Sequence, residues 1–188
     1  MERAAWHDGG VDDRALVDAV LAGDRDLFRV LVEREEVAVY RTCLRILGRP
    51  HDAEDAAQES FVMAYRSLGS YRGEGRLGGW LLRIAIRHAY RRLGQRRETA
   101  ELQPDVPLGA PGSDPLSITL AGERQRAVRL AVAALSEPYR EVVALRFFGE
   151  LSLDEIAAAT RRPLNTVKTH LRRGLERLRP MVGREAMA

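Results

Sequence analysis

The segment Arg161–Arg184 combines hydrogen-bond donors with positive charge, since it carries eight cations against one acid. Asn, Thr, Lys and Arg side chains at the start of a helix can donate to base edges in a major groove and to the flanking phosphates. The residues predicted to face outward are Asn165, Thr166, Lys168, Thr169, Arg172 and Arg173. The alternative is an ordinary amphipathic hairpin with a solvated basic face, although the charge bias argues against it.

A second basic segment lies between Gly75 and Arg97, with seven arginines and no acid. The spacing of Arg83, Arg87 and Arg91 puts them on one stripe of a helix. Aromatic rings beside such a stripe suit single-stranded DNA, because a base stacked on a ring contributes roughly 1–3 kcal/mol while cations follow the backbone. The candidates are Tyr71, Arg72, Arg76, Trp80, Arg83, Arg87 and Arg91. The alternative is that Trp80 and Tyr90 are core residues.

The segment Asp52–Glu59 has the opposite charge, with four acids and no cation. One surface helix supplies neither the oxygen cage of a metal site nor the cleft of a catalytic carboxylate. Taken alone, it is a solvated face. The sequence also lacks a phosphate-binding loop, HExxH, paired CxxC and GxSxG, and its four histidines are scattered. We therefore expect no enzymatic activity, no metal and no cofactor.

Helices must position these groups, because apolar residues recur at helical spacing and strand alternation is absent. In the first half we expect a short helix ending at Gly23 and a second helix capped by Asp24. Gly48 and Pro50 should end that second helix. A third helix, capped by Asp52, should turn Ala56, Phe61, Val62, Tyr65 and Leu68 inward. A glycine-rich loop, Gly69–Gly79, then leads into a fourth helix over about Trp80–Gln95.

The second half repeats this helical pattern. We expect a helix over Leu120–Leu135, a helix capped by Ser136, and a short helix over Leu153–Ala159 with a Ser152/Glu155 capping box. A tight turn at Arg161–Pro163 precedes a last helix that Pro180 should stop. That helix should turn Val167, Leu171, Leu175 and Leu178 inward. Two helices joined by such a turn are the pattern of a helix-turn-helix.

One long segment rich in proline and glycine interrupts the helical pattern. This segment marks a domain boundary. The predicted organisation is a tail over 1–11, a helical domain over 12–97, a flexible Pro-rich linker over 98–118, a helix-turn-helix domain over 119–182 and a tail over 183–188. The fold class is all-α. About 20 linker residues reach up to ~70 Å.

Membrane insertion and secretion are not expected. The longest apolar run is six residues, Leu130–Leu135, and Met1–Gly10 has no apolar core segment. The single cysteine, Cys43, allows no internal disulfide. We expect a cytoplasmic protein. Because its charges are segregated, we also expect separate surfaces for separate partners.

These segments, in this order, resemble the extracytoplasmic-function (ECF, group IV) sigma factors of bacterial RNA polymerase. Asp52–Phe61 is similar to the signature of the family's region 2, and Tyr71–Gly75 with Trp80–Ala85 is similar to its promoter-melting segment. Leu135–Arg146, Leu151–Ala157 and Thr166–Arg172 are similar to region 4 and its recognition helix. Ile86 and Arg87 depart from the family pattern, which continues there with an Arg or polar residue and then Asn.

The resemblance implies a promoter-specificity subunit that binds core polymerase through its clamp helices and flap. Region 2 would read and melt the −10 element as a single strand, through the loop Ser70–Gly79 and the arginine helix. Region 4 would read the −35 element as duplex, with Arg162 joining the outward residues named above. The acidic helix becomes the polymerase-binding face, through Asp52, Glu54, Asp55, Gln58 and Glu59. The resemblance also implies an anti-sigma factor as a partner.

Two other functions are compatible with parts of the sequence. A stand-alone helix-turn-helix regulator would bind intact duplex as a dimer, and it would need a self-complementary interface and a palindromic site. An enzyme acting on nucleic acid would need a cluster of acids, a nucleophile or a metal set, and no such cluster is visible in the sequence.

Overall fold

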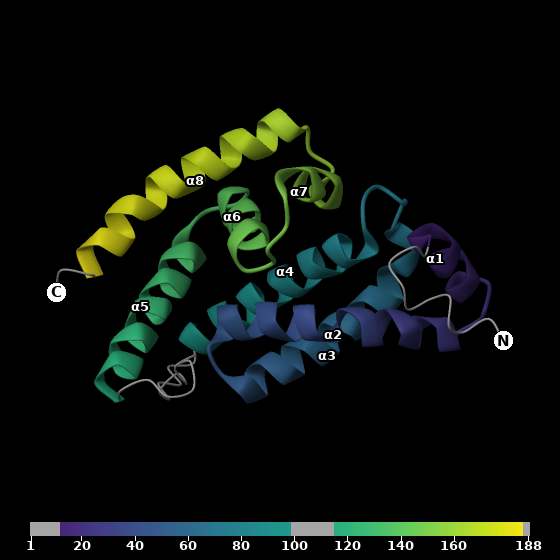
Figure 1. The fold of residues 1–188 in the computed structure, drawn as a ribbon, viewed down its shortest axis with the longest axis horizontal. Helices are drawn as coiled ribbons and strands as arrows, with labels where there is room; N and C mark the ends of the chain where they lie inside the picture. The colour runs from purple at the N-terminus through teal and green to yellow at the C-terminus, as the bar shows by residue number, and fades with distance from the viewer. Residues whose placement is uncertain (1–11, 99–114, 186–188) are drawn as a thin grey trace.

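The computed structural model describes residues 12–98 and 115–185, and every regular element in these ranges is helical (Figure 1). The predicted all-α class is therefore confirmed. The N-terminal tail and most of the predicted linker lie outside the described residues. The elements are α1 (Asp13–Leu21), α2 (Asp26–Leu47), α3 (Pro50–Ser67), the 3-10 helix η2 (Leu68–Ser70), α4 (Leu77–Glu98), α5 (Pro115–Ala134), α6 (Tyr139–Phe147), α7 (Leu153–Thr160) and α8 (Leu164–Glu185).

The first domain is a bundle of α2, α3 and α4, with α1 packed across one end of α2 (Figure 1). Its helices meet through fully buried aliphatic side chains, among them Leu31, Val39, Ile46, Leu81 and Ile86. Removing such chains from water is the main favourable contribution to folding. This packing holds the basic helix α4 and the acidic helix α3 in one rigid body.

The second domain packs α5, α6 and α7 against the long helix α8. Its buried side chains include Val142, Leu145, Ile156 and Val167. The two domains are in contact, because α4 packs against both α6 and α7 and α2 touches α5. Buried side chains from both domains form one continuous apolar cluster.

Several helix ends confirm the sequence predictions. Gly48 ends α2 in the left-handed conformation, with φ 76°, which glycine adopts without steric cost. Ser152 and Glu155 form the predicted capping box: the Glu155 N–H donates to Ser152 Oγ at 3.2 Å, and the Ser152 N–H donates to Glu155 Oε2 at 2.9 Å.

Other predicted helix ends are wrong. Arg25, not Asp24, is the N-cap of α2. Pro50 begins α3 rather than only ending α2, because a proline at the first helical position needs no N–H partner. Asp52 therefore lies in the first turn of α3. The N-cap of α6 is Pro138 rather than Ser136.

The two long basic helices also extend further than predicted. Helix α4 begins at Leu77, so Gly78 and Gly79 are helical rather than part of the loop. Helix α8 continues through Pro180 to Glu185. The carbonyl that Pro180 leaves without an intrahelical donor belongs to Glu176, on an exposed turn where water can bond to it.

Three side chains predicted to face inward are exposed instead. Val62 is 48% exposed, Tyr65 40% and Leu175 40%. Helical spacing identified an apolar stripe on α3 and on α8, but it did not reveal how wide the partner surface is. The apolar side chains at the edge of each stripe are left in contact with solvent.

Cys43 lies fully buried on α2. Burial raises the pKa of its thiol to about 12, although Arg92 acts in the opposite direction. Because the thiolate is the reactive species, we expect the native thiol at pH 8 to react with a disulfide reagent at least about 100-fold more slowly than in denaturant. Measured labelling rates that agreed within about tenfold would contradict this burial.

Candidate nucleic-acid and partner interfaces

The helix-turn-helix is built as the sequence predicts, from α7, a short turn and α8. Arg161 adopts a left-handed conformation with φ 54°, and its N–H donates to Ala158 O at 3.2 Å. The Arg162 N–H donates to Ala157 O at 3.0 Å. With Ile156 and Val167 buried between the helices, the start of α8 is held at a fixed angle to α7.

The outward face of α8 carries the predicted base- and phosphate-binding groups. Asn165, Lys168, Arg172 and Arg173 are exposed, while Arg162, Thr166 and Thr169 are half-buried. Arg172 pairs with Glu176 at 2.6 Å. Within the described ranges, Lys168 and Arg173 have no ion-pair partner. Their cations are free to bind an external phosphate.

The glycine-rich loop is anchored at both ends. The Tyr71 hydroxyl donates to Gly75 O at 2.7 Å, and the Tyr71 and Trp80 rings pack at 5.9 Å between centroids. At the start of α4, the Leu77 N–H donates to Asp13 Oδ2 at 2.6 Å. These contacts give the segment between Tyr71 and Leu77 a defined shape.

The structure separates the predicted single-strand-binding residues into two groups. Arg72, Arg76, Arg87 and Arg91 are exposed, whereas Tyr71 and Trp80 are buried. In this arrangement the two rings are not accessible to a nucleotide, so they form the framework of the loop, as the alternative interpretation held for Trp80 and Tyr90. Arg83 is half-buried in contact with the second domain.

The acidic helix α3 presents its predicted residues on the surface. Glu54, Gln58 and Glu59 are exposed, and Asp52 and Asp55 are half-exposed. Arg92 of α4 reaches both Glu59 at 3.1 Å and Asp55 at 3.4 Å. Sequence reasoning missed the apolar part of this surface, because Val62 and Tyr65 continue the helical spacing from Glu54 and Gln58. The face is therefore acidic at one end and apolar at the other.

His88 connects the acidic helix to the basic one and is not a free ligand. An Arg91 guanidinium nitrogen lies 2.9 Å from Nδ1. Because arginine only donates, Nδ1 accepts and Nε2 carries the hydrogen. Nε2 lies 2.7 Å from Glu59 Oε2. Burial lowers the pKa of His88, with Glu59 acting in the opposite direction, so the ring is neutral at pH 7.

Glu141 of α6 joins arginines from both basic segments. The Arg83 Nε donates to Glu141 Oε1 at 2.8 Å, and an Arg162 guanidinium nitrogen lies 2.7 Å from Glu141 Oε2. The carboxylate is only 4% exposed. Burial acts to raise the pKa of Glu141, but the two guanidinium groups outweigh it and the pKa is lowered. Glu141 is therefore ionised at neutral pH.

Helix α7 lies directly against the glycine-rich loop. The Arg161 guanidinium donates to Ser70 O at 2.7 Å and lies 3.7 Å from Glu74. In the opposite direction across the interface, Arg76 lies 3.5 Å from Glu155. A Cβ added at Gly75, whose φ is +74°, would approach Ala158 Cβ to 2.5 Å. Only a glycine allows the loop and α7 this close to each other.

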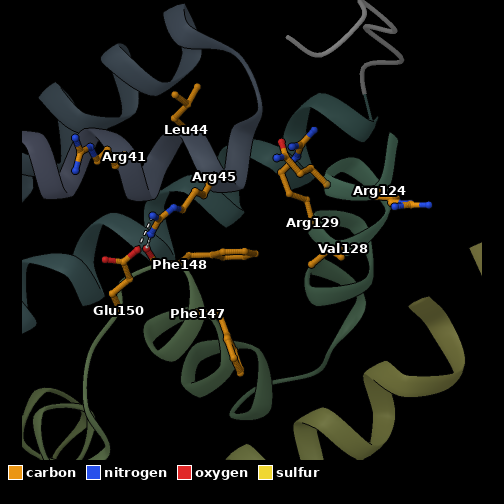
Figure 2. Close-up of a pocket in the computed structure, with 10 residues that line it drawn as sticks. Arg41, Leu44, Arg45, Arg124, Val128, Arg129, Phe147, Phe148 and Glu150 are labelled. Atoms are coloured by element: carbon orange, nitrogen blue, oxygen red, sulfur yellow. Dashed lines mark hydrogen bonds and ion pairs between the residues drawn. The ribbon is translucent and has the colours of Figure 1, made fainter. Parts of the chain in front are cut away.

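A groove of about 680 Å³ lies between α2 of the first domain and α5 and α6 of the second (Figure 2). Its walls combine apolar and cationic side chains: Arg41, Leu44, Arg45, Arg124, Gln125, Val128, Arg129, Phe147, Phe148 and Glu150. Phe147 is 51% exposed. Figure 2 shows Arg45 reaching Glu150 and the Phe148 carbonyl, which it contacts at 2.5 and 2.9 Å. The sequence carries no signal for this groove, since its walls come from separate domains.

No group of three or more His, Cys, Asp or Glu side chains is placed to hold a metal ion in residues 12–98 and 115–185. In the same ranges, no helix is both long and apolar enough to span a bilayer. The arrangement offers binding surfaces of opposite charge.

Two family models match the chain. The model of Sigma-70 region 2 covers residues 31–99, and that of Sigma-70, region 4 covers residues 125–178. Among curated relatives, the ECF RNA polymerase sigma factor SigW of Bacillus subtilis is 32% identical over 173 residues, covering 87% of this chain and 92% of the relative. The ECF RNA polymerase sigma-E factor of Escherichia coli K12 is 31% identical over 186 residues, covering 92% and 97%.

Solved structures share the fold. CnrH, in complex with the cytosolic domain of CnrY, superposes with a TM-score of 0.58 at 23% identity, over 92% of this chain and 98% of CnrH. The sigma factor RpoE from Bartonella quintana, in complex with the anti-sigma factor NepR, gives a TM-score of 0.54 at 20% identity, over 83% and 96%.

Proposed function

The chain belongs to the ECF branch of the sigma-70 family of RNA polymerase sigma factors, and from that premise we propose how its separate surfaces divide the work. It directs RNA polymerase to promoters and is not an enzyme. The observation that carries the proposal is the segregation of charge, with two basic surfaces on different domains and one acidic face on α3.

The second domain reads the −35 element through α8. The start of this helix is held by the capping box and the left-handed Arg161, and its exposed face carries Asn165, Lys168, Arg172 and Arg173. A helix of this kind enters the major groove with its first turns against base edges. Lys168 and Arg173 supply phosphate contacts, which give salt-dependent affinity without sequence information.

The first domain reads the −10 element through the loop and α4. The exposed arginines Arg72, Arg76, Arg87 and Arg91 follow the single-stranded backbone. Tyr71 and Trp80 hold the loop in shape from beneath. Each domain binds DNA weakly by itself. When both domains are attached to one polymerase, the second DNA contact becomes intramolecular, and the overall affinity for DNA rises.

The α3 face binds core polymerase. Glu54 and Gln58 are exposed and have no ion-pair or hydrogen-bond partner in the described part of the chain, and Val62 adds apolar area beside them. Asp52, Asp55 and Glu59 complete the acidic part of this face. Acidic side chains steer association and suppress wrong partners, while the apolar area supplies affinity. This partner places the protein in the cytoplasm.

An anti-sigma factor is a further partner. CnrH and the Bartonella RpoE were both solved with a bound protein, and for RpoE this protein is the anti-sigma factor NepR. In this chain the groove between α2, α5 and α6 suits an amphipathic helix with acidic flanks, because Phe147 and Val128 are exposed between arginines.

Run-off transcription tests the proposal. Core polymerase plus this protein, on fragments of genomic DNA, should give discrete start sites that core polymerase alone does not give. The upstream sequences should share two elements at a fixed spacing. A protein that bound an inverted repeat tightly without polymerase, and gave no start sites with it, would instead be a dimeric regulator.

A further inference from the structure

We propose that Glu141 is a positioning residue for the −35 surface of the second domain. Its carboxylate holds the Arg162 guanidinium beside the start of α8, so that the remaining donors of this arginine meet a backbone phosphate of the −35 duplex. Glu141 itself stays buried and does not touch DNA. This inference rests on the proposed function of α8, and it adds to that function a residue from the buried side of α6.

The backbone of Arg162 is fixed by the turn between α7 and α8. Its N–H donates to Ala157 O at 3.0 Å, at the end of α7. The next residue is Pro163, and a residue that precedes proline is largely restricted to extended conformations. The Pro163 carbonyl accepts from the Thr166 and Val167 N–H groups at 2.9 and 3.1 Å, which begins α8. The direction in which the Arg162 side chain leaves the turn is therefore set by both helices.

Glu141 then fixes the end of that side chain. The Arg162 Nη1 lies 2.7 Å from Glu141 Oε2, and the Glu141 side chain is only 4% exposed. Arg83 of the first domain binds the other carboxylate oxygen, Oε1, at 2.8 Å. Because each arginine has an oxygen of its own, the contact between Glu141 and Arg162 lies wholly within the second domain. It does not depend on the contact with the first domain.

The rest of the Arg162 guanidinium is available to an external group. Its side chain is 25% exposed, and it makes no other hydrogen bond or ion pair in the described part of the chain. A guanidinium group presents five N–H donors in a fixed planar fork. A carboxylate bound at one edge therefore orients the other edge, which can bind a phosphate with two parallel hydrogen bonds.

Arg162 lies on the side of α8 that carries another exposed cation. Thr166, His170 and Arg173 recur at helical spacing and share this side of α8. Burial lowers the pKa of His170, and the charges of Arg162 and Arg173 lower it further, so both cations lie near this ring. Arg173 is exposed and has no ion-pair partner within the described ranges. Two cations near one side chain of a recognition helix suit the phosphates that border a major groove.

Glu141→Gln tests the positioning role, because the amide keeps the size of the side chain and removes its charge. The affinity of the holoenzyme for a duplex promoter mapped by run-off should fall about tenfold, and the slope of log affinity against log salt should be smaller by about one unit. Long-range electrostatics alone predicts the opposite sign, since the substitution makes the net charge more positive and should strengthen DNA binding. Affinity is measured at several salt concentrations, at a temperature where both proteins are folded.

Glu137→Gln is the matched control. Glu137 is exposed just before α6 and lies 3.0 Å from Arg140, which the −35 surface does not include. This variant makes the same change of carboxylate to amide beside an arginine, so its salt slope should equal that of the wild type. If Glu141 served only the stability of the fold, Glu141→Gln would lower the melting temperature and leave the salt slope unchanged.

Variants of Arg162 test the same contact from its other side. Arg162→Lys keeps the positive charge, but an ammonium group has no planar fork with which to join a carboxylate to a phosphate. It should lose most of the affinity that Arg162→Ala loses. In the Arg162→Ala background, Glu141→Gln should have no further effect on affinity or salt slope, because the two residues act through one contact.

The positioning role is overturned if a folded Glu141→Gln variant binds the promoter as tightly as the wild type, or loses affinity with an unchanged salt slope. Full additivity with Arg162→Ala overturns it too. If Glu141→Gln does not fold, Arg162→Lys decides, and wild-type affinity in that variant overturns the proposal. A wild-type chain that directs no initiation with core polymerase contradicts the sigma-factor activity, whereas normal initiation by the wild type together with unaffected variants contradicts only the role of Glu141.

Discussion

Glu54→Arg is expected to abolish association with core polymerase, with at least about a 100-fold loss of affinity, because a cation at the acidic end of the α3 face opposes a positive partner surface. The loss should appear both in co-elution with core polymerase and in run-off transcription. Binding of the helix-turn-helix domain to duplex DNA should be unchanged, since Glu54 lies in the other domain.

Glu54 separates docking from folding better than its neighbours do. It is exposed, and no ion pair involves it within residues 12–98 and 115–185. Asp55, by contrast, lies 3.4 Å from both Arg92 and His51. A charge reversal at Asp55 should also remove polymerase binding, but it would place a cation beside Arg92 and weaken the α3–α4 contact as well.

Glu36→Arg is the matched control for this prediction. Glu36 is exposed on α2, a helix outside the proposed docking face. Its replacement by arginine changes the net charge by the same amount as Glu54→Arg. Its melting temperature and polymerase binding should match those of the wild type. Equal loss of binding in both variants would show that net charge, and not the α3 face, governs association.

Local sequence signals predicted the individual helices well, because each depends on residues close in the chain. The Ser152/Glu155 spacing identified the start of α7, and Gly48 identified the end of α2. The outward residues of α8 followed from helical periodicity once its apolar side was known. These features need only neighbouring residues and backbone stereochemistry, so they can be read without the fold.

The interface between the domains could not be predicted in this way. Glu141 precedes the apolar run Val142–Leu145 and looks like one more surface acid in the sequence. One partner, Arg83, lies 58 residues before it, and the other, Arg162, lies in the turn between α7 and α8. The close contact of Gly75 with Ala158 is equally remote in the chain. Tyr71 and Trp80 were likewise candidates for base stacking because nothing local showed that they pack on each other.

Lys168→Ala and Arg172→Ala are each expected to lower promoter-directed transcription about tenfold or more, while core polymerase binding is retained. A contact to a base edge or phosphate contributes about 1–3 kcal/mol to DNA binding, and both side chains are exposed on the outward face of α8. Their removal leaves the core of the domain intact, so the melting temperature should not change. Purified holoenzyme tested on the promoters mapped by run-off gives the measurement.

The two variants should differ in salt dependence and sequence preference. A side chain that contacts only phosphate weakens binding uniformly and lowers the salt slope by about one unit. One that reads a base relaxes preference at one position of the −35 element instead. Lys168 has no ion-pair partner within the described residues, so Lys168→Ala directly measures the contribution of one cation to DNA binding. Arg172 must first release Glu176, which it contacts at 2.6 Å.

Arg179→Ala is the matched control, since it removes an exposed arginine from the same helix farther from the turn. Transcription should fall much less in this variant than in the other two. If all three lost activity equally, the whole basic helix would act only through its charge, and no reading of sequence by its first turns would be needed. If Lys168→Ala or Arg172→Ala lost polymerase binding, the division of work between α3 and α8 would be wrong.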